Sequence, residues 1–120
     1  MRSVYIASAL LLSVITLIIC NSIYVLHRTD ELLALCDDID KSGSATEGID
    51  ELLSLWQNCR DPLSLSINHS EIDRAESALL SMRDYFMEGD TPNFRAQLSV
   101  FRNAVEHIAE IQRISFHNIF

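Results

Sequence analysis

The residues best able to do chemistry in this chain are four histidines, three cysteines and seventeen carboxylates, but their spacing fits no common metal or catalytic site. A carboxylate-bridged di-iron bundle uses Glu-x-x-His pairs. The residues three positions before the histidines are Tyr24, Ser66, Ala104 and Ile114. His-Glu-x-x-His, Cys-x-x-Cys, Gly-rich phosphate-loop and Gly-x-Ser-x-Gly patterns are also missing from the sequence. We therefore expect no metal, no cofactor and no catalytic residue.

Two histidines do have acidic neighbours that could serve as surface ligands. His69 is close in sequence to Glu71 and Asp73, and His107 has Glu106 and Glu110 nearby. We interpret the first group as a helix end and the second as a solvated helix face, since carboxylates at helical spacing usually face water.

The cysteines are Cys20, Cys36 and Cys59. A disulfide between the last two would suit an oxidising compartment. In an antiparallel helix pair that turns near Ser42, however, the two cysteines are offset by roughly 15 Å along the axis. A disulfide needs Cα atoms within about 7 Å. We predict no intrachain disulfide, and we interpret Cys20 as a small apolar residue of the N-terminal segment.

An uncharged, mostly apolar run extends from Ser3 to Leu26. A membrane-spanning helix needs roughly 20 such residues. A cleaved signal peptide is the main alternative, but the run is longer than a usual signal core and the segment 17–21 lacks the small residues of a cleavage site. We therefore predict an uncleaved transmembrane anchor at residues 1–27, followed by one domain at residues 28–120.

Charge leaves the orientation of the anchor nearly undecided, but it excludes one class of partner. Arg2 on one side of the apolar run nearly balances Arg28 and Lys41 on the other, so the positive-inside rule decides little. The short N-terminal tail favours a cytoplasmic N-terminus, which makes the chain a single-pass membrane protein with an extracytoplasmic C-terminal domain. A net charge of −8 argues against nucleic-acid binding.

The rest of the chain has the apolar spacing of three and four residues that is typical of bundle helices. The repeating positions are Ile49, Leu52, Trp56, Cys59 and Leu63, then Ile72, Ala75, Leu79, Met82 and Phe86, then Phe94, Leu98, Phe101, Val105 and Ile108. The first helix should continue from the membrane through Leu32, Leu33, Leu35 and Cys36 to about Asp40. The predicted fold is all-α, an N-terminal transmembrane helix that continues into an up-down bundle of about four helices.

Three sequence breaks separate these helices. The first is at residues 41–44, where Ser44 and Glu47 fit a capping box. Ser70 and Asp73 fit the same pattern. In the third break, at residues 89–92, a Gly would follow a helix end, Thr91 would be the N-cap and Pro92 the first helical residue.

Pro62 complicates the second helix. Proline kinks or breaks a helix interior, and Asp61 could cap a fresh start. Leu63, Leu65 and Ile67 alternate with polar residues, as in a strand. Because the sequence offers no partner strand, we predict helix here.

Three short motifs resemble a known bacterial family. They are Trp56 on the second helix, H-x-E-I-D at residues 69–73 and S-x-x-N-I at residues 115–119. In order and spacing the chain resembles the domain-of-unknown-function family 4363 over nearly its whole length. The resemblance implies an N-terminal hydrophobic segment, a helical remainder and a continuous helix at Pro62. That family has no established activity, so the resemblance implies no catalytic residue.

The motif positions are also the candidate interaction positions: Trp56, His69, Glu71, Asp73 and Asn118. Trp56 should be a core anchor, and Asn118 should form a hydrogen bond with the first helix. In an up-down bundle the start of the third helix and the end of the fourth meet at the membrane-proximal end. His69 and Asn118 could therefore form a small binding site there, beside residues near Arg28.

The leading functional hypothesis is a non-catalytic interaction or accessory module. Its expected partners are the lipid bilayer and either another membrane protein or a second copy of the chain. One alternative is an extracytoplasmic ligand-sensing module, similar in layout to the external four-helix domains of chemoreceptors. Another is a small enzyme that uses His69 and carboxylates, which are abundant here.

Overall fold

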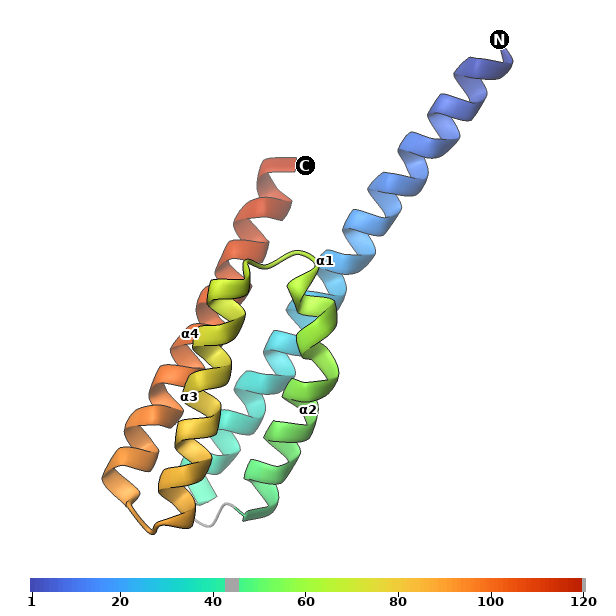
Figure 1. The fold of residues 1–120 in the computed structure, drawn as a ribbon. Helices are drawn as coiled ribbons and strands as arrows, with labels where there is room; N and C mark the ends of the chain where they lie inside the picture. Colours follow the sequence, from blue (N-terminus) through green and yellow to red (C-terminus); the bar gives the residue numbers. More distant parts are fainter. Residues whose placement is uncertain (43–45, 120) are drawn as a thin grey trace.

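Four helices make up the part of the chain that the computed structural model describes, residues 1–42 and 46–119. They are α1 (Arg2–Ser42), α2 (Thr46–Ser64), α3 (His69–Met87) and α4 (Thr91–Ile119), and the described residues contain no strand. The helices alternate in direction, and α4 packs against α1 and α3 while α2 packs against the same two helices (Figure 1). The predicted all-α up-down bundle of about four helices is confirmed.

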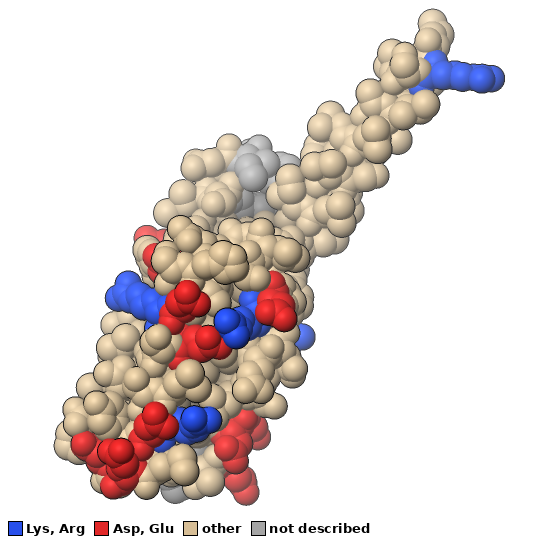
Figure 2. All heavy atoms as spheres, in the orientation of Figure 1, with Lys and Arg blue, Asp and Glu red and all other residues tan. Residues whose placement is uncertain are grey.

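The first helix is much longer than the bundle that it joins. It has 41 residues, and its N-terminal half projects from one end of a molecule that measures 68 × 22 × 20 Å (Figure 1). Large apolar side chains on this half are 51–73% exposed, namely Val4, Tyr5, Ile6, Leu10, Leu11, Leu12, Val14 and Leu17. The projecting part is long and apolar enough to cross a membrane, and a signal sequence would have the same length and composition. Its surface shows no acidic side chain in Figure 2.

The core consists of the seams that the apolar spacing predicted. All five positions of the α2 seam are buried, and so are all five positions of the α4 seam. On α3, four positions are buried and Phe86 is partly buried. Trp56 and Phe101 are the largest fully buried side chains, and they meet edge to face with ring centroids 5.7 Å apart. This geometry is favourable for aromatic pairs and joins α2 to α4 across the centre of the bundle.

The packed half of α1 supplies the fourth wall of the core. Leu32, Cys36 and Ile39 are buried there, as expected for a helix that continues from the apolar segment. Ser22 and Val25 are also buried. The packing of α1 against the bundle thus begins before residue 28, where we expected the anchor to end and the domain to begin. The division at residues 27 and 28 stays a prediction.

Pro62 lies inside α2, which continues to Ser64. The Leu63 carbonyl then accepts hydrogen bonds from the amides of Ser66 and Ile67 at 3.1 and 2.9 Å, which closes the helix end into a turn. Leu63 and Ile67 are buried while Leu65 is 83% exposed. The alternating pattern is thus a helix end and a turn rather than a strand. The helix predicted here continues through Pro62 to Ser64, but the prediction is wrong for Leu65 and Ile67, which lie in the turn.

The predicted cap of α3 is wrong by two residues. The N-cap is Asn68, whose side-chain oxygen accepts a hydrogen bond from the Ser70 amide at 3.1 Å. Ser70 is already helical, so it does not start a capping box with Asp73. Asn and Ser are comparably good N-caps, and here the backbone of the preceding turn places Asn68 at the helix start.

The predicted cap of α4 is wrong by one residue. Asp90 Oδ1 accepts a hydrogen bond from the Asn93 amide at 3.2 Å, and Thr91 is the first helical residue. Gly89 follows the end of α3 with φ of +77°, a conformation that favours glycine, as expected. The proposed Ser44–Glu47 capping box lies outside the described residues.

The position of the α3 cap gives a stability prediction. Replacing Asn68 with Ala should lower the free energy of unfolding by about 0.5–2 kcal/mol, because the Ser70 amide loses its acceptor. Ser70→Ala is the matched control and should change it by less than about 0.5 kcal/mol, because an exposed helical Ser contributes little. Denaturant unfolding of the full chain in detergent, followed by far-UV circular dichroism, measures both. A larger loss for Ser70→Ala than for Asn68→Ala would contradict this assignment.

Candidate functional site

Trp56 belongs to the core rather than to a surface site. Its side chain is 1% exposed and packs on Phe101. The Nε1 atom is buried without a hydrogen-bond partner among the described residues. One turn later, the Cys59 thiol donates to the Trp56 carbonyl at 3.6 Å. No ligand could contact the indole without opening the bundle.

The H-x-E-I-D motif occupies the start of α3. Its Ile72 belongs to the core, and of its polar residues only Glu71 has an ion-pair contact with another helix among the described residues. His69 and Asp73 are exposed. Glu71 is partly buried, and its Oε1 lies 3.6 Å from His107 Nε2 on α4. Its Oε2 is buried and has no hydrogen-bond partner among the described residues. The sequence interpretation placed His107 on a solvated acidic face of its own helix and missed Glu71, because this pair is 36 positions apart in the chain.

His69 and Asn118 lie at the same end of the bundle, as expected, but at different heights (Figure 1). Glu71 and His107 are level because they are in contact. Asn118 comes 11 residues after His107, which places it about 16 Å further along α4. The two motif residues therefore do not converge on one small molecule. Asn118 instead lines an open hollow between α4 and α1, together with Leu26, Arg113, Ile114 and His117.

The sequence analysis predicted that Asn118 forms a hydrogen bond with the first helix. In the structure, Gln112 makes the polar contact between the end of α4 and α1. Gln112 Nε2 donates to Ser22 Oγ at 2.8 Å. Ser22 is 2% exposed and Gln112 is 6% exposed, so each polar group has a partner in a buried place. This bond fixes the height of α4 against the apolar segment of α1.

Arg28 is held on its own helix. Its guanidinium carbon lies 5.2 Å from the centre of the Tyr24 ring, and its Nη1 is 3.2 Å from Glu31 Oε2. Tyr24 contributes most to the raised pKa of Arg28. His27 Nε2 also contacts Glu31, at 2.7 Å. These contacts all lie along α1, and the Nε atom of Arg28 is buried without a hydrogen-bond partner among the described residues.

The two cysteines of the bundle are buried free thiols. Burial raises the pKa of Cys36 to about 12 and that of Cys59 to about 11. At neutral pH both are therefore almost entirely protonated, whereas a reactive cysteine needs thiolate character. Cys20 is exposed on the projecting part of α1.

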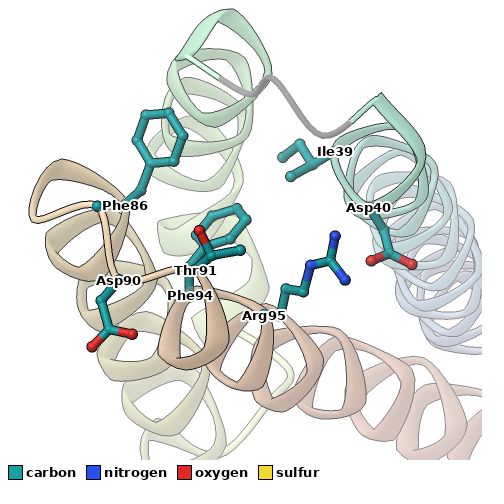
Figure 3. A pocket seen from close by; sticks show the side chains of 8 residues that line it. Ile39, Asp40, Phe86, Asp90, Thr91, Phe94 and Arg95 are labelled. Carbon is teal, nitrogen blue, oxygen red and sulfur yellow. The ribbon is translucent and has the colours of Figure 1, made fainter.

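A second hollow, of about 130 Å³, lies at the opposite end of the bundle. Figure 3 shows the rings of Phe86 and Phe94 beside it, with Asp40 and Arg95 extending from α1 and α4. Its size would suit a molecule no larger than a single aromatic ring. None of the five candidate interaction positions from the sequence lines it. Within the described residues, no group of three or more His, Cys, Asp and Glu side chains is placed to hold a metal ion.

Comparison with known proteins gives one match. A family model described as Domain of unknown function (DUF4363) matches residues 22–119. The match begins at Ser22, the residue that accepts the hydrogen bond from Gln112, and it ends in the last turn of α4. It therefore covers the packed bundle and leaves out the projecting part of α1. No curated protein and no solved structure matches the chain.

Proposed function

Because the chain belongs to the family described as Domain of unknown function (DUF4363), the family gives no function, and we propose one from the geometry. The protein is a single-pass membrane-anchored bundle that acts as a non-catalytic accessory module for a membrane partner. The observation that carries this proposal is the continuity of α1. One helix presents a bare apolar surface at its N-terminal half and packs into the core at its C-terminal half.

The bare half of α1 requires a non-aqueous environment. Large exposed apolar patches are rare on soluble monomers and mark contact with protein or membrane. The patch surrounds the helix, with Leu10, Leu11 and Leu12 all more than 60% exposed at successive positions. Three successive helical residues point in three directions, about 100° apart, so one partner surface could not cover them all. A surrounding bilayer would.

The segment in which a signal peptidase would cut favours a retained anchor over a cleaved signal sequence. Residues 17–21 are helical, and Ile18 and Ile19 are partly buried. Both are also bulky, whereas a signal peptidase site needs small residues. We infer that α1 stays attached to the bundle.

The non-catalytic role rests on how the reactive side chains are distributed. The two thiols of the bundle, Cys36 and Cys59, are buried and protonated, Glu71 contacts His107, and His69 lies at a different height from Asn118. What the membrane-proximal end does offer is an exposed apolar side chain, Leu65, in the turn between α2 and α3. This position would meet a partner that sits beside the anchor in the membrane.

The anchor can be tested with a charge in the middle of the bare segment. Leu11→Arg should shift a large part of the protein out of the membrane fraction, because a central arginine costs about 2.5–3.5 kcal/mol of insertion free energy. Met87→Arg, at an exposed site on α3, is the matched control and should stay in the membrane. The measurement is carbonate extraction followed by intact mass. A membrane-free product that lacks the first 20 or so residues would reveal a signal sequence instead.

The orientation can be tested with an impermeant maleimide on intact cells. Ser77 is exposed on α3, so a Ser77→Cys, Cys20→Ala chain has one accessible thiol, and the buried Cys36 and Cys59 should stay unlabelled. An extracytoplasmic bundle predicts labelling without permeabilisation. Labelling that requires permeabilisation would place the bundle in the cytoplasm. The chain with Cys20→Ala alone is the control and should stay unlabelled in both conditions.

The accessory role predicts a neighbour at the membrane-proximal end. A photo-crosslinking amino acid in place of Leu65 should give an adduct heavier than the monomer in native membranes, whereas one in place of Met87, which is also exposed but lies at the distal end, should not. Mass spectrometry then separates another membrane protein from a second copy of the chain. Recovery of monomer alone from both positions would argue against an accessory role.

A further inference from the structure

The end of the bundle from which α1 projects carries no carboxylate side chain. Counting along the chain, the acidic residues begin at Asp30 on α1, stop at Asp61 on α2, resume at Glu71 on α3 and end at Glu110 on α4. The stretches between these limits, residues 3–29, 62–70 and 111–119, meet at this end (Figure 1). Their basic side chains are Arg28, Arg113, His27, His69 and His117. In Figure 2 the acidic side chains lie on the body of the bundle, away from the projecting helix.

This asymmetry stands out because the protein as a whole is strongly acidic, with a net charge of −8. A uniformly acidic body would be repelled by an anionic bilayer surface. With its carboxylates kept away from the membrane-proximal end, the molecule can approach such a surface in one orientation, basic end first. Basic residues close to an anionic leaflet are attracted to it, and the attraction fades within a Debye length.

The register between α1 and α4 places two of these basic groups at the boundary between the hydrocarbon region and the lipid headgroups. Since Gln112 is level with Ser22, Arg113 and His117 lie beside the part of α1 that leads into the bare segment. If the hydrocarbon region were to contain residues 3–26, the end of α4 would be buried in it. Residues 3–19 alone span about 25 Å, which is close to the thickness of a bilayer core. Counting from the Ser22–Gln112 pair, Arg113 is then level with about residue 21 and His117 with about residue 17, so the last turns of α4 lie at the boundary between the hydrocarbon and the headgroup layer.

Arg113 and His117 are one helical turn apart, and both are exposed. They border the hollow whose apolar lining includes Leu26 and Ile114. Arg113 has no ion-pair partner among the described residues, unlike Arg28, which contacts Glu31. Guanidinium groups bind phosphate through paired hydrogen bonds, and the ring N–H of His117 adds a donor on the same face. An apolar hollow bordered by phosphate-binding groups matches the chemistry of a phospholipid at the top of its acyl chains.

We propose that the α1/α4 end of the bundle docks on anionic phospholipid, with Arg113 and His117 binding the lipid phosphate. This inference rests on the proposed anchoring and adds to it a contact between the end of α4 and the lipid surface. The anchor holds the protein in the bilayer, and this second contact holds the bundle close to the surface in a defined orientation.

The test uses the full chain in nanodiscs, made either of zwitterionic lipid alone or with about one third phosphatidylglycerol. Amide hydrogen exchange over residues 111–119 should be roughly fivefold slower with the anionic lipid, the factor expected for one basic residue at such a surface. The double variant Arg113→Gln, His117→Gln should lose this difference, and so should the unmodified chain in high salt. Arg95→Gln is the matched control, because Arg95 is exposed on the same helix at the distal end and its loss should leave the difference intact.

The outcomes separate this inference from the proposed function. A chain that does not co-purify with nanodiscs would overturn the anchor itself. A chain that is anchored but exchanges equally in both lipids would overturn the lipid contact alone, and so would an equal effect of the Arg95 and Arg113 variants. Unchanged exchange over residues 69–87 in all variants would show that the bundle remains folded.

Discussion

One unbroken backbone hydrogen-bond ladder joins the bare half of α1 to its buried half, and the rest of the structure depends on it. Residues 2–42 contain neither Gly nor Pro, the usual causes of a sharp helix kink. Leu11 and Leu32 therefore belong to the same rigid rod, although the first is exposed and the second is fully buried. Any tilt or rotation of the projecting segment is passed directly to the bundle.

The other long helix braces this rod. With 29 residues, α4 is longer than α2 and α3, which have 19 each, and it extends past their shared turn beside α1. It packs against α1 within the shared core, and above that core Gln112 makes a polar contact with Ser22. The buried polar bond specifies a register that apolar contacts alone would leave free to slide. The two helices together form a neck between the bare segment and the four-helix core.

The sequence predicts the helices and their buried faces well, because a spacing of three and four residues reports directly on which side of a helix is apolar. It misplaces helix starts by one or two residues, since Asn68 and Ser70, or Asp90 and Thr91, are all suitable caps and only the backbone decides between them. It also misses what depends on the relative height of helices. The contact of Gln112 with Ser22 joins residues 90 positions apart, and no local pattern announces it. His69 and Asn118 lie at different heights for a similar reason: α4 is longer than α3, and no local pattern shows how far it extends past the start of α3.

The two thiols of the bundle have a consequence for how the protein matures. Cys36 and Cys59 are shielded from solvent, and burial keeps both protonated, so oxidants that attack the thiolate find little to react with. The chain requires neither an oxidase to complete its fold nor a reductant to preserve it. Once folded, the bundle therefore keeps the same buried thiols in a reducing or an oxidising milieu.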